Sequence, residues 1–262
     1  AIGAFNAMVV SSMMGCTVSF TIPFCLGCVP KALHRDMLLG LLCGIVTIPV
    51  GVLVGGLVAG FDPLMVLRNL IPIVLIAVVI ALGLWRAEKW MIRGFGIFGK
   101  LIIALITVGL TAAIVESLTG FTVIPGMAPI EEGFETVGAI AIVLAGAFPL
   151  VFVLTRLLKK PLLKLGSLLS INDTAAGGLI ASLANSIATF GLLKDMDDRG
   201  RMLNTAALVS GSCIIGDHLA YTTQIAPDLC SALLAGKFVG MALALLLAAF
   251  LAPRLLKTSA AK

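Results

Sequence analysis

An acidic and a basic side chain, Asp217 and His218, stand next to each other within an otherwise apolar run. Ile214-Ile215-Gly216 precede them and Leu219-Ala220-Tyr221 follow. An ionisable residue inside a long apolar segment is costly, and it usually faces a path for ions or solutes. A carboxylate can balance an ammonium group, and an imidazole can change its charge near neutral pH. The pair therefore indicates a cation site or a proton relay; the alternative is a pair that satisfies itself within a helical bundle.

Other polar side chains also lie in apolar surroundings. Asn185 and Ser186 are at the centre of a glycine-containing stretch, where unpaired helix ends would offer their dipoles to a ligand. Contacts between helices are the alternative role for such residues. Ser212 lies shortly before Asp217 in the same apolar run. Lys237 is expected to extend its ammonium group to a membrane surface, or else to be a fixed charge that pairs with Asp217.

The sequence lacks the signatures of common enzymes and metal sites. It contains no GxSxG, HExxH or P-loop motif. A Ser-His-Asp triad would need His218, but neighbouring residues point to different faces of a helix. Cys25 and Cys28 form a single CxxC pair without a second pair, so we expect no metal and no cofactor. The net charge of +5 comes with no basic and aromatic interleaving, so we expect no nucleic-acid partner.

The elements that position these residues are predicted to be membrane-spanning helices. Hydrophobic residues make up 60% of the chain and charged residues 12%, against about half and a quarter in soluble domains. Several uncharged stretches approach the roughly 20 residues that a helix needs to cross a bilayer. The fold class is therefore an all-α, polytopic membrane protein. We expect seven spans, over residues 4–29, 37–60, 64–85, 95–115, 133–155, 202–223 and 231–253.

The positive charges predict the topology of these spans. Nearly all Lys and Arg residues lie in alternate connections, which assigns those connections to the cytoplasm. The alternation fails if residues 165–193 cross the membrane, and it holds if they enter and return on the cytoplasmic side. Polar and glycine-broken backbone is tolerated at membrane depth where protein or water covers it. We therefore predict a re-entrant hairpin over residues 165–193, with Asn185 and Ser186 at its tip.

A weak internal repeat is also present. The ten residues from Ser11 align with the ten from Ser212, so that Gly15 matches Gly216 and Phe20 matches Tyr221. The charge pattern gives the two copies opposite directions, which is the arrangement of many secondary transporters. We expect residues 1–60 to end a first inverted repeat, 61–132 to form connecting spans, and 133–262 to form the second repeat.

Several stretches of this chain resemble the bacterial ethanolamine transporters of the EutH type. The most specific are Ala181-Ser-Leu-Ala-Asn-Ser186, Lys194-Asp-Met-Asp-Asp-Arg-Gly200 and Gly216-Asp-His-Leu219. Further matching stretches begin at Ser12, Gly44, Ala104, Ile124 and Lys160. The similarity extends over the whole chain, which corresponds to the C-terminal two thirds of a longer family member. The resemblance implies a multi-pass permease of the bacterial inner membrane that carries ethanolamine by alternating access, with homo-oligomers possible.

The residues are compatible with that substrate. Ethanolammonium is a small cation with a hydroxyl group, which a carboxylate, an amide and an aromatic face would suit. We therefore expect a substrate site made of Asp217, His218, Asn185, Ser186, Tyr221 and Ser212. Two alternatives stay open: a carrier for another small polar solute, and a membrane-embedded enzyme that uses Asp217 and His218.

Overall fold

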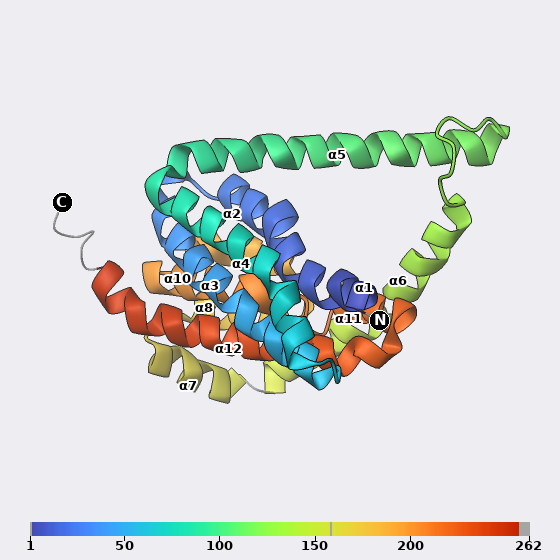
Figure 1. Ribbon diagram of the computed structural model, residues 1–262. Helices are drawn as coiled ribbons and strands as arrows, with labels where there is room; N and C mark the ends of the chain where they lie inside the picture. The colour runs from blue at the N-terminus through green and yellow to red at the C-terminus, as the bar shows by residue number, and fades with distance from the viewer. Residues whose placement is uncertain (1, 158, 257–262) are drawn as a thin grey trace.

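The computed structural model describes residues 2–157 and 159–256, and every element in these ranges is a helix (Figure 1). The order is α1 (Ile2–Phe5), η1 (Asn6–Gly15), η2 (Thr17–Thr21), α2 (Ile22–Cys28), η3 (Lys31–Leu33), α3 (His34–Val58), α4 (Pro63–Arg86), α5 (Glu88–Thr119), α6 (Ile130–Leu157), α7 (Lys159–Leu169), α8 (Asp173–Ala184), α9 (Ser186–Leu192), η4 (Leu193–Asp195), α10 (Asp198–Gly211), α11 (Asp217–Ile225), η5 (Pro227–Leu229) and α12 (Cys230–Leu255). The all-α prediction is confirmed.

Five helical stretches in the described ranges are long and apolar enough to cross a membrane, at Ile2–Cys25, Lys31–Val58, Pro63–Gly83, Lys89–Thr119 and Pro227–Leu255. They correspond to five of the seven predicted spans. A sixth predicted span, residues 133–155, falls within the 28-residue helix α6, which is not among the five. The prediction of one continuous helix over residues 202–223 is wrong, because α10 ends at Gly211 and α11 begins at Asp217.

Helix α3 lies at the centre of the bundle and packs on its neighbours through glycines. A Cβ atom added to Gly40 or Gly44 would lie 2.2 and 2.7 Å from the carbonyl oxygens of Met202 and Ala206 in α10. A Cβ atom on Gly51 would lie 2.6 Å from the carbonyl oxygen of Gly236 in α12. Small residues four apart let helix backbones approach in this way within membranes. We call this contact of α3 with α10 and α12 the glycine seam.

The contact pairs also fix the directions of the helices. Gly40 faces Met202 and Gly44 faces Ala206, so α3 and α10 run parallel. Gly51 faces Gly236 and Gly55 faces Ala232, so α3 and α12 run antiparallel. The N-terminal segment Ile2–Cys25 is antiparallel to α10, because the Thr17 hydroxyl donates to the Val209 carbonyl at 3.0 Å while Ser12 lies near His218 in α11. Segments 4–29 and 202–223 therefore have the opposite directions that the charge pattern predicts.

Basic residues gather where α3 and α10 begin and α12 ends. Arg35 donates to the Leu255 carbonyl, and Arg199 donates to the Ala249 carbonyl at 3.2 Å. Arg201 is 4% exposed and forms an ion pair with Asp36 at 3.1 Å. We call this end of the bundle the basic end. It is the end that the positive charges assign to the cytoplasm.

Residues Asp173–Leu192 form a helical hairpin that turns at Asn185. The Thr189 hydroxyl donates to the Gly178 carbonyl at 2.9 Å, so α9 folds back beside α8. The two ends of the hairpin are also joined. The Asn172 side chain donates to the Asp195 carbonyl at 3.0 Å, and its backbone amide donates to the Asp197 carboxylate at 2.9 Å. The hairpin therefore starts and finishes at the basic end, and the preceding helix α7 is separate from it.

Helices α4 and α5 expose much of their apolar surface. Leu101, Ile103 and Leu105 are each more than 60% exposed. Figure 1 shows α5 along one side of the bundle and extending beyond it, with α6 returning toward α11. Contiguous apolar surface of this extent is rare on soluble monomers. It suits contact with lipid chains, in agreement with the predicted class of membrane protein.

Candidate functional site

The chain leaves the helical path between Gly211 and Asp217. Ser212 is extended, and Cys213 has a φ of +55°, a conformation that few non-glycine residues adopt. Gly216 lies against the end of α8, where an added Cβ atom would stand 1.9 Å from the Ala184 carbonyl oxygen. Only glycine allows that approach. The break therefore depends on Gly216, which the sequence singles out through its match to Gly15 and as the first residue of a stretch that resembles the transporter family.

The tip of the hairpin meets this break. The amides of Cys213 and Ile215 donate to the carbonyls of Ser182 and Leu183 at 2.8 and 2.9 Å. These carbonyls belong to the last turn of α8, which has no partners within its own helix. Two interrupted helices thus complete each other's backbone hydrogen bonds. Helix α8 has 12 residues, so the junction lies about 18 Å along the helix from the basic end.

Asn185 and Ser186 serve this junction directly. The Asn185 side chain accepts a hydrogen bond from the Ile187 amide at 2.7 Å and so caps α9. The Ser186 hydroxyl is buried and contacts the Cys213 thiol at 3.3 Å. Ser212 is also buried, and its hydroxyl has no hydrogen-bond partner. All three predicted residues therefore lie where the two interrupted helices meet.

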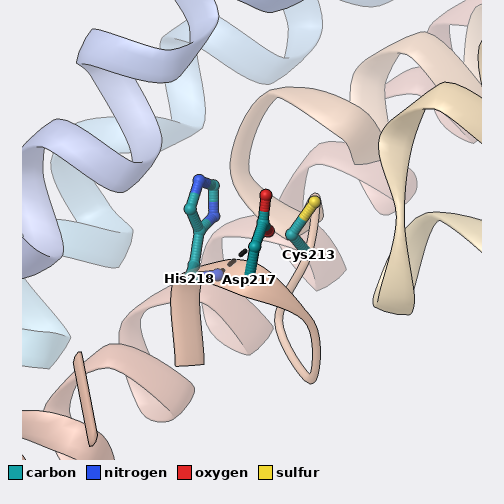
Figure 2. Close-up of side chains that lie close together, drawn as sticks. All are labelled: Cys213, Asp217 and His218. Atoms are coloured by element: carbon teal, nitrogen blue, oxygen red, sulfur yellow. Dashed lines mark hydrogen bonds between the residues drawn. The ribbon is translucent and has the colours of Figure 1, made fainter. Parts of the chain in front are cut away.

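Asp217 and His218 begin α11, and Figure 2 shows that their side chains point to the same side of the ribbon as that of Cys213. One ligand atom from each of the three lies within 4.8 Å of the others. Asp217 is exposed, and its carboxylate accepts a hydrogen bond from the His218 amide at 2.9 Å. A negative charge in the first turn of a helix is favourable. Three donors are fewer than the four protein ligands of a structural zinc site.

Lys237 enters the same region from α12. Its side chain is fully buried, and its Nζ lies 3.0 Å from Nδ1 of His218. It also donates to the Ser12 carbonyl at 3.1 Å. His218 Nδ1 is in addition 3.2 Å from the Ser212 carbonyl oxygen. The expectation that Lys237 reaches a membrane surface is wrong, because its ammonium group is held between η1 and α11.

A cavity of about 180 Å³ opens beside these contacts. It is lined by Ala7, Met8, Ser11, Ser12, His218, Tyr221 and Thr222. Its two walls are η1 and α11, which the sequence pairs as the two copies of the internal repeat. Of the predicted site residues, His218 and Tyr221 line the cavity. Asp217 does not line it but has a carboxylate oxygen within 4.8 Å of the His218 ring nitrogen.

Sequence reasoning missed Ser11 and Ser12 as site residues. Both stand in the internal repeat, and Ser12 begins one of the stretches that resemble the transporter family. The internal repeat and the family resemblance could therefore have identified Ser11 and Ser12 from the sequence. Asn204, in contrast, serves packing: its amide donates to the Ala175 and Gly200 carbonyls at 2.9 Å and so ties α10 to α8.

Sequence comparison shows the family to which the chain belongs. The profile of the ethanolamine utilisation protein EutH matches residues 1–251. The chain belongs to the EutH family. The family match covers essentially the whole chain, and the described helices through most of α12 fall within it.

Individual relatives agree with the family match. The chain is 50% identical to a protein of Listeria monocytogenes named probable ethanolamine permease EutH, over 99% of this chain and 70% of that protein. It is 39% identical to a Salmonella typhimurium protein of the same name, over 95% of this chain and 67% of the relative. A Bacillus subtilis relative, named uncharacterized protein YxeR, is 42% identical over 96% of this chain. No solved structure matches.

Proposed function

We propose that this EutH-family chain is a permease for ethanolamine in the cytoplasmic membrane of a bacterium. The observation that carries the proposal is that relatives named probable ethanolamine permease match along nearly the whole chain. Five helices with the length and composition of membrane spans support it. We propose further that α6 crosses the membrane, that α10 and α11 cross it together as one interrupted span, and that Asp173–Leu192 is re-entrant from the cytoplasm.

The cavity between η1 and α11 is the proposed substrate site. Its volume suits a molecule of a few heavy atoms, well below the 300–1,000 Å³ of pockets for drug-sized ligands. Tyr221 offers an aromatic face to an ammonium group, and the Ser11 hydroxyl can bond the substrate hydroxyl. Asp217, next to His218, supplies the negative charge. Asn185, Ser186 and Ser212 then hold the interrupted helices that position α11.

The geometry favours transport over catalysis. Nδ1 of His218 faces the Ser212 carbonyl and Lys237, and the Ser12 hydroxyl donates to the Val9 carbonyl at 2.9 Å. Among the described residues, no side-chain hydroxyl forms a hydrogen bond with the His218 ring, as the hydroxyl of a nucleophile would. A cavity between two oppositely directed segments, one of which is interrupted between α10 and α11, suits alternating access. Two further proposals are that the chain corresponds to the C-terminal two thirds of a family member and that its residues 1–60 and 133–262 are inverted repeats.

Uptake of labelled ethanolamine into liposomes tests the proposal. Asp217→Asn removes a negative charge that lies beside the cavity wall formed by His218, so it should lower affinity about tenfold, and uptake at low substrate should be lost. Asp228→Asn, which changes an exposed carboxylate in η5, is the matched control and should transport normally. Normal uptake by Asp217→Asn would remove this carboxylate from the site. Conversion of ethanolamine into another compound would contradict transport as the activity.

A further inference from the structure

The burial of Lys237 is not explained by packing alone. Its side chain is fully buried in α12, and no carboxylate of the described residues lies within the 4.0 Å of an ion pair with it. An ammonium group in such a place loses its water without gaining an opposite charge in contact. The residue before it, Gly236, packs against Gly51 and Gly55 of α3, which carry no charge.

The contacts of Lys237 allow two exclusive proton arrangements. In the first arrangement, Lys237 is charged and Nδ1 of His218 carries no proton, so that Lys237 donates to Nδ1 and the Ser212 carbonyl receives no hydrogen bond from the ring. In the second arrangement, Nδ1 carries a proton and donates a hydrogen bond to the Ser212 carbonyl, and Lys237 is neutral. Both sets of distances, 3.0 and 3.2 Å, are within hydrogen-bond range. Because two positive charges this close repel strongly in a buried place, the pair carries at most one excess proton.

The same two neighbours of Lys237 line the substrate cavity. Nζ of Lys237 contacts the carbonyl oxygen of Ser12 and the ring nitrogen Nδ1 of His218. Both of these residues belong to the cavity wall. A cation bound there would stand next to a charged Lys237. The other ionisable groups that interact with Lys237 are Cys16 near η1, Cys213 in the break and Asp217 in α11. Asp217 favours either cation, so it cannot satisfy a substrate and a charged Lys237 at once.

We propose that Lys237 and His218 form a proton-exchange pair, from which binding of one ammonium substrate expels one proton. The site then alternates between a proton on Lys237 and a cation in the cavity, and the permease exchanges substrate for protons. This inference rests on the proposed function. It adds the identity of the exchanged ion, which the family match does not supply.

Equilibrium binding of ethanolamine to the purified full chain, between about pH 6 and pH 8, tests the exchange. An alkylamine keeps its proton throughout this range, so released protons come from the protein. Calorimetry in buffers of different ionisation enthalpy counts them. The wild-type chain should release about one proton for each ethanolamine that it binds. Where Lys237 is charged, the Kd for ethanolamine should fall about tenfold for each unit by which the pH is raised.

Three variants locate the proton. Lys237→Met should bind ethanolamine without proton release and with little pH dependence. Lys237→Arg keeps a permanent charge, so it should bind at least tenfold more weakly than the wild type and also release no proton; it serves if the methionine variant does not fold. Lys194→Met, which changes an exposed lysine at the end of the hairpin, should behave as the wild type.

The outcomes separate this inference from the proposed function. Binding of ethanolamine without proton release, or unchanged release by Lys237→Met, would overturn the exchange pair and leave the permease intact. Binding of methylammonium or choline with release, but not of ethanolamine, would support the pair and refute the substrate. Failure of the wild-type chain to bind any of these cations would overturn both.

Discussion

At the scale of single residues, Gly216 decides how the two interrupted helices meet. The Ala184 carbonyl occupies the space that any Cβ atom at position 216 would need. The amides of Cys213 and Ile215, which come just before Gly216, donate to the Ser182 and Leu183 carbonyls at the end of α8. The position of Asp217 and His218 therefore depends on a residue that has no side chain.

Substitution of Gly216 tests this dependence. Gly216→Ala should destabilise the chain by about 1–3 kcal/mol, the usual cost of inserting a methyl group into a packed site. Thermal unfolding in detergent would measure the change. Gly109→Ala is the control, because an added Cβ atom there meets nothing within 4 Å and alanine favours a helix. Equal stability of both variants would contradict the close contact.

The chemistry of the site residues could be predicted from their types, but their roles could not. An acid and an imidazole in an apolar run indicate a candidate site from the sequence alone. That Lys237 turns inward to Ser12 and His218 depends on contacts between residues up to 225 positions apart. No local pattern contains those contacts.

At the scale of elements, the hairpin is closed at its base. Asn172 binds both Asp195 and Asp197, so the chain enters and leaves at one end. Charge alternation predicted a return over residues 165–193, and the polar tip predicted the turn at Asn185. The turn is present, but the hairpin begins only at Asp173, and its re-entry into a membrane stays a prediction. The break of α10 before α11 was not predicted, because Ser212 to Gly216 is as apolar as a continuous span. Its cause is the backbone of α8, which is distant in sequence.

Labelling from one side of the membrane tests the hairpin. On a background without reactive native cysteines, Lys164→Cys and Asp195→Cys should both react with a maleimide only from the cytoplasmic side, since both precede or follow the closed base. Glu132→Cys, at the start of α6, should react from the outside. Labelling of positions 164 and 195 from opposite sides would exclude a re-entrant hairpin.

The ion pair at the basic end joins α3 to α10. Arg201 is buried and binds Asp36, Asp198 and the Met196 carbonyl. Asp36→Asn should lower stability by about 1.5–3 kcal/mol, because a charge-assisted bond to a buried guanidinium is weakened. Asp195→Asn is the exposed control and should change little. Detergent unfolding midpoints would decide between a structural pair and an incidental one.

At the scale of the whole molecule, the directions of the helices agree with the positions of the positive charges. Helices α3 and α10 start at the basic end and α12 finishes there. The two segments that the sequence aligns, from Ser11 and from Ser212, run antiparallel and share one cavity. These features are what an inverted pair requires. Whether a two-fold rotation superposes the pair stays a prediction.

Reporter fusions test the orientation of the molecule. Green fluorescent protein joined after Leu256 should fluoresce, because the end of α12 carries Arg254 and lies at the basic end, which the positive charges assign to the cytoplasm. Alkaline phosphatase joined after Gly120 should be active, because the charge pattern predicts that the end of α5 lies outside. The opposite pattern of activity would invert the topology and place the base of the hairpin outside.

The glycine seam has a mechanical consequence. Along it the carbonyl oxygens of α10 and α12 stand where α3 side chains would begin, so an axial shift of one residue, about 1.5 Å, would drive side chains into backbone. Helices α3, α10 and α12 should therefore form a rigid scaffold. The cavity wall Asn6–Gly15 contacts this scaffold partly through the flexible side chain of Met13. We expect the N-terminal segment to tilt and so to admit the substrate to the cavity, while the rigid scaffold of α3, α10 and α12 keeps its shape.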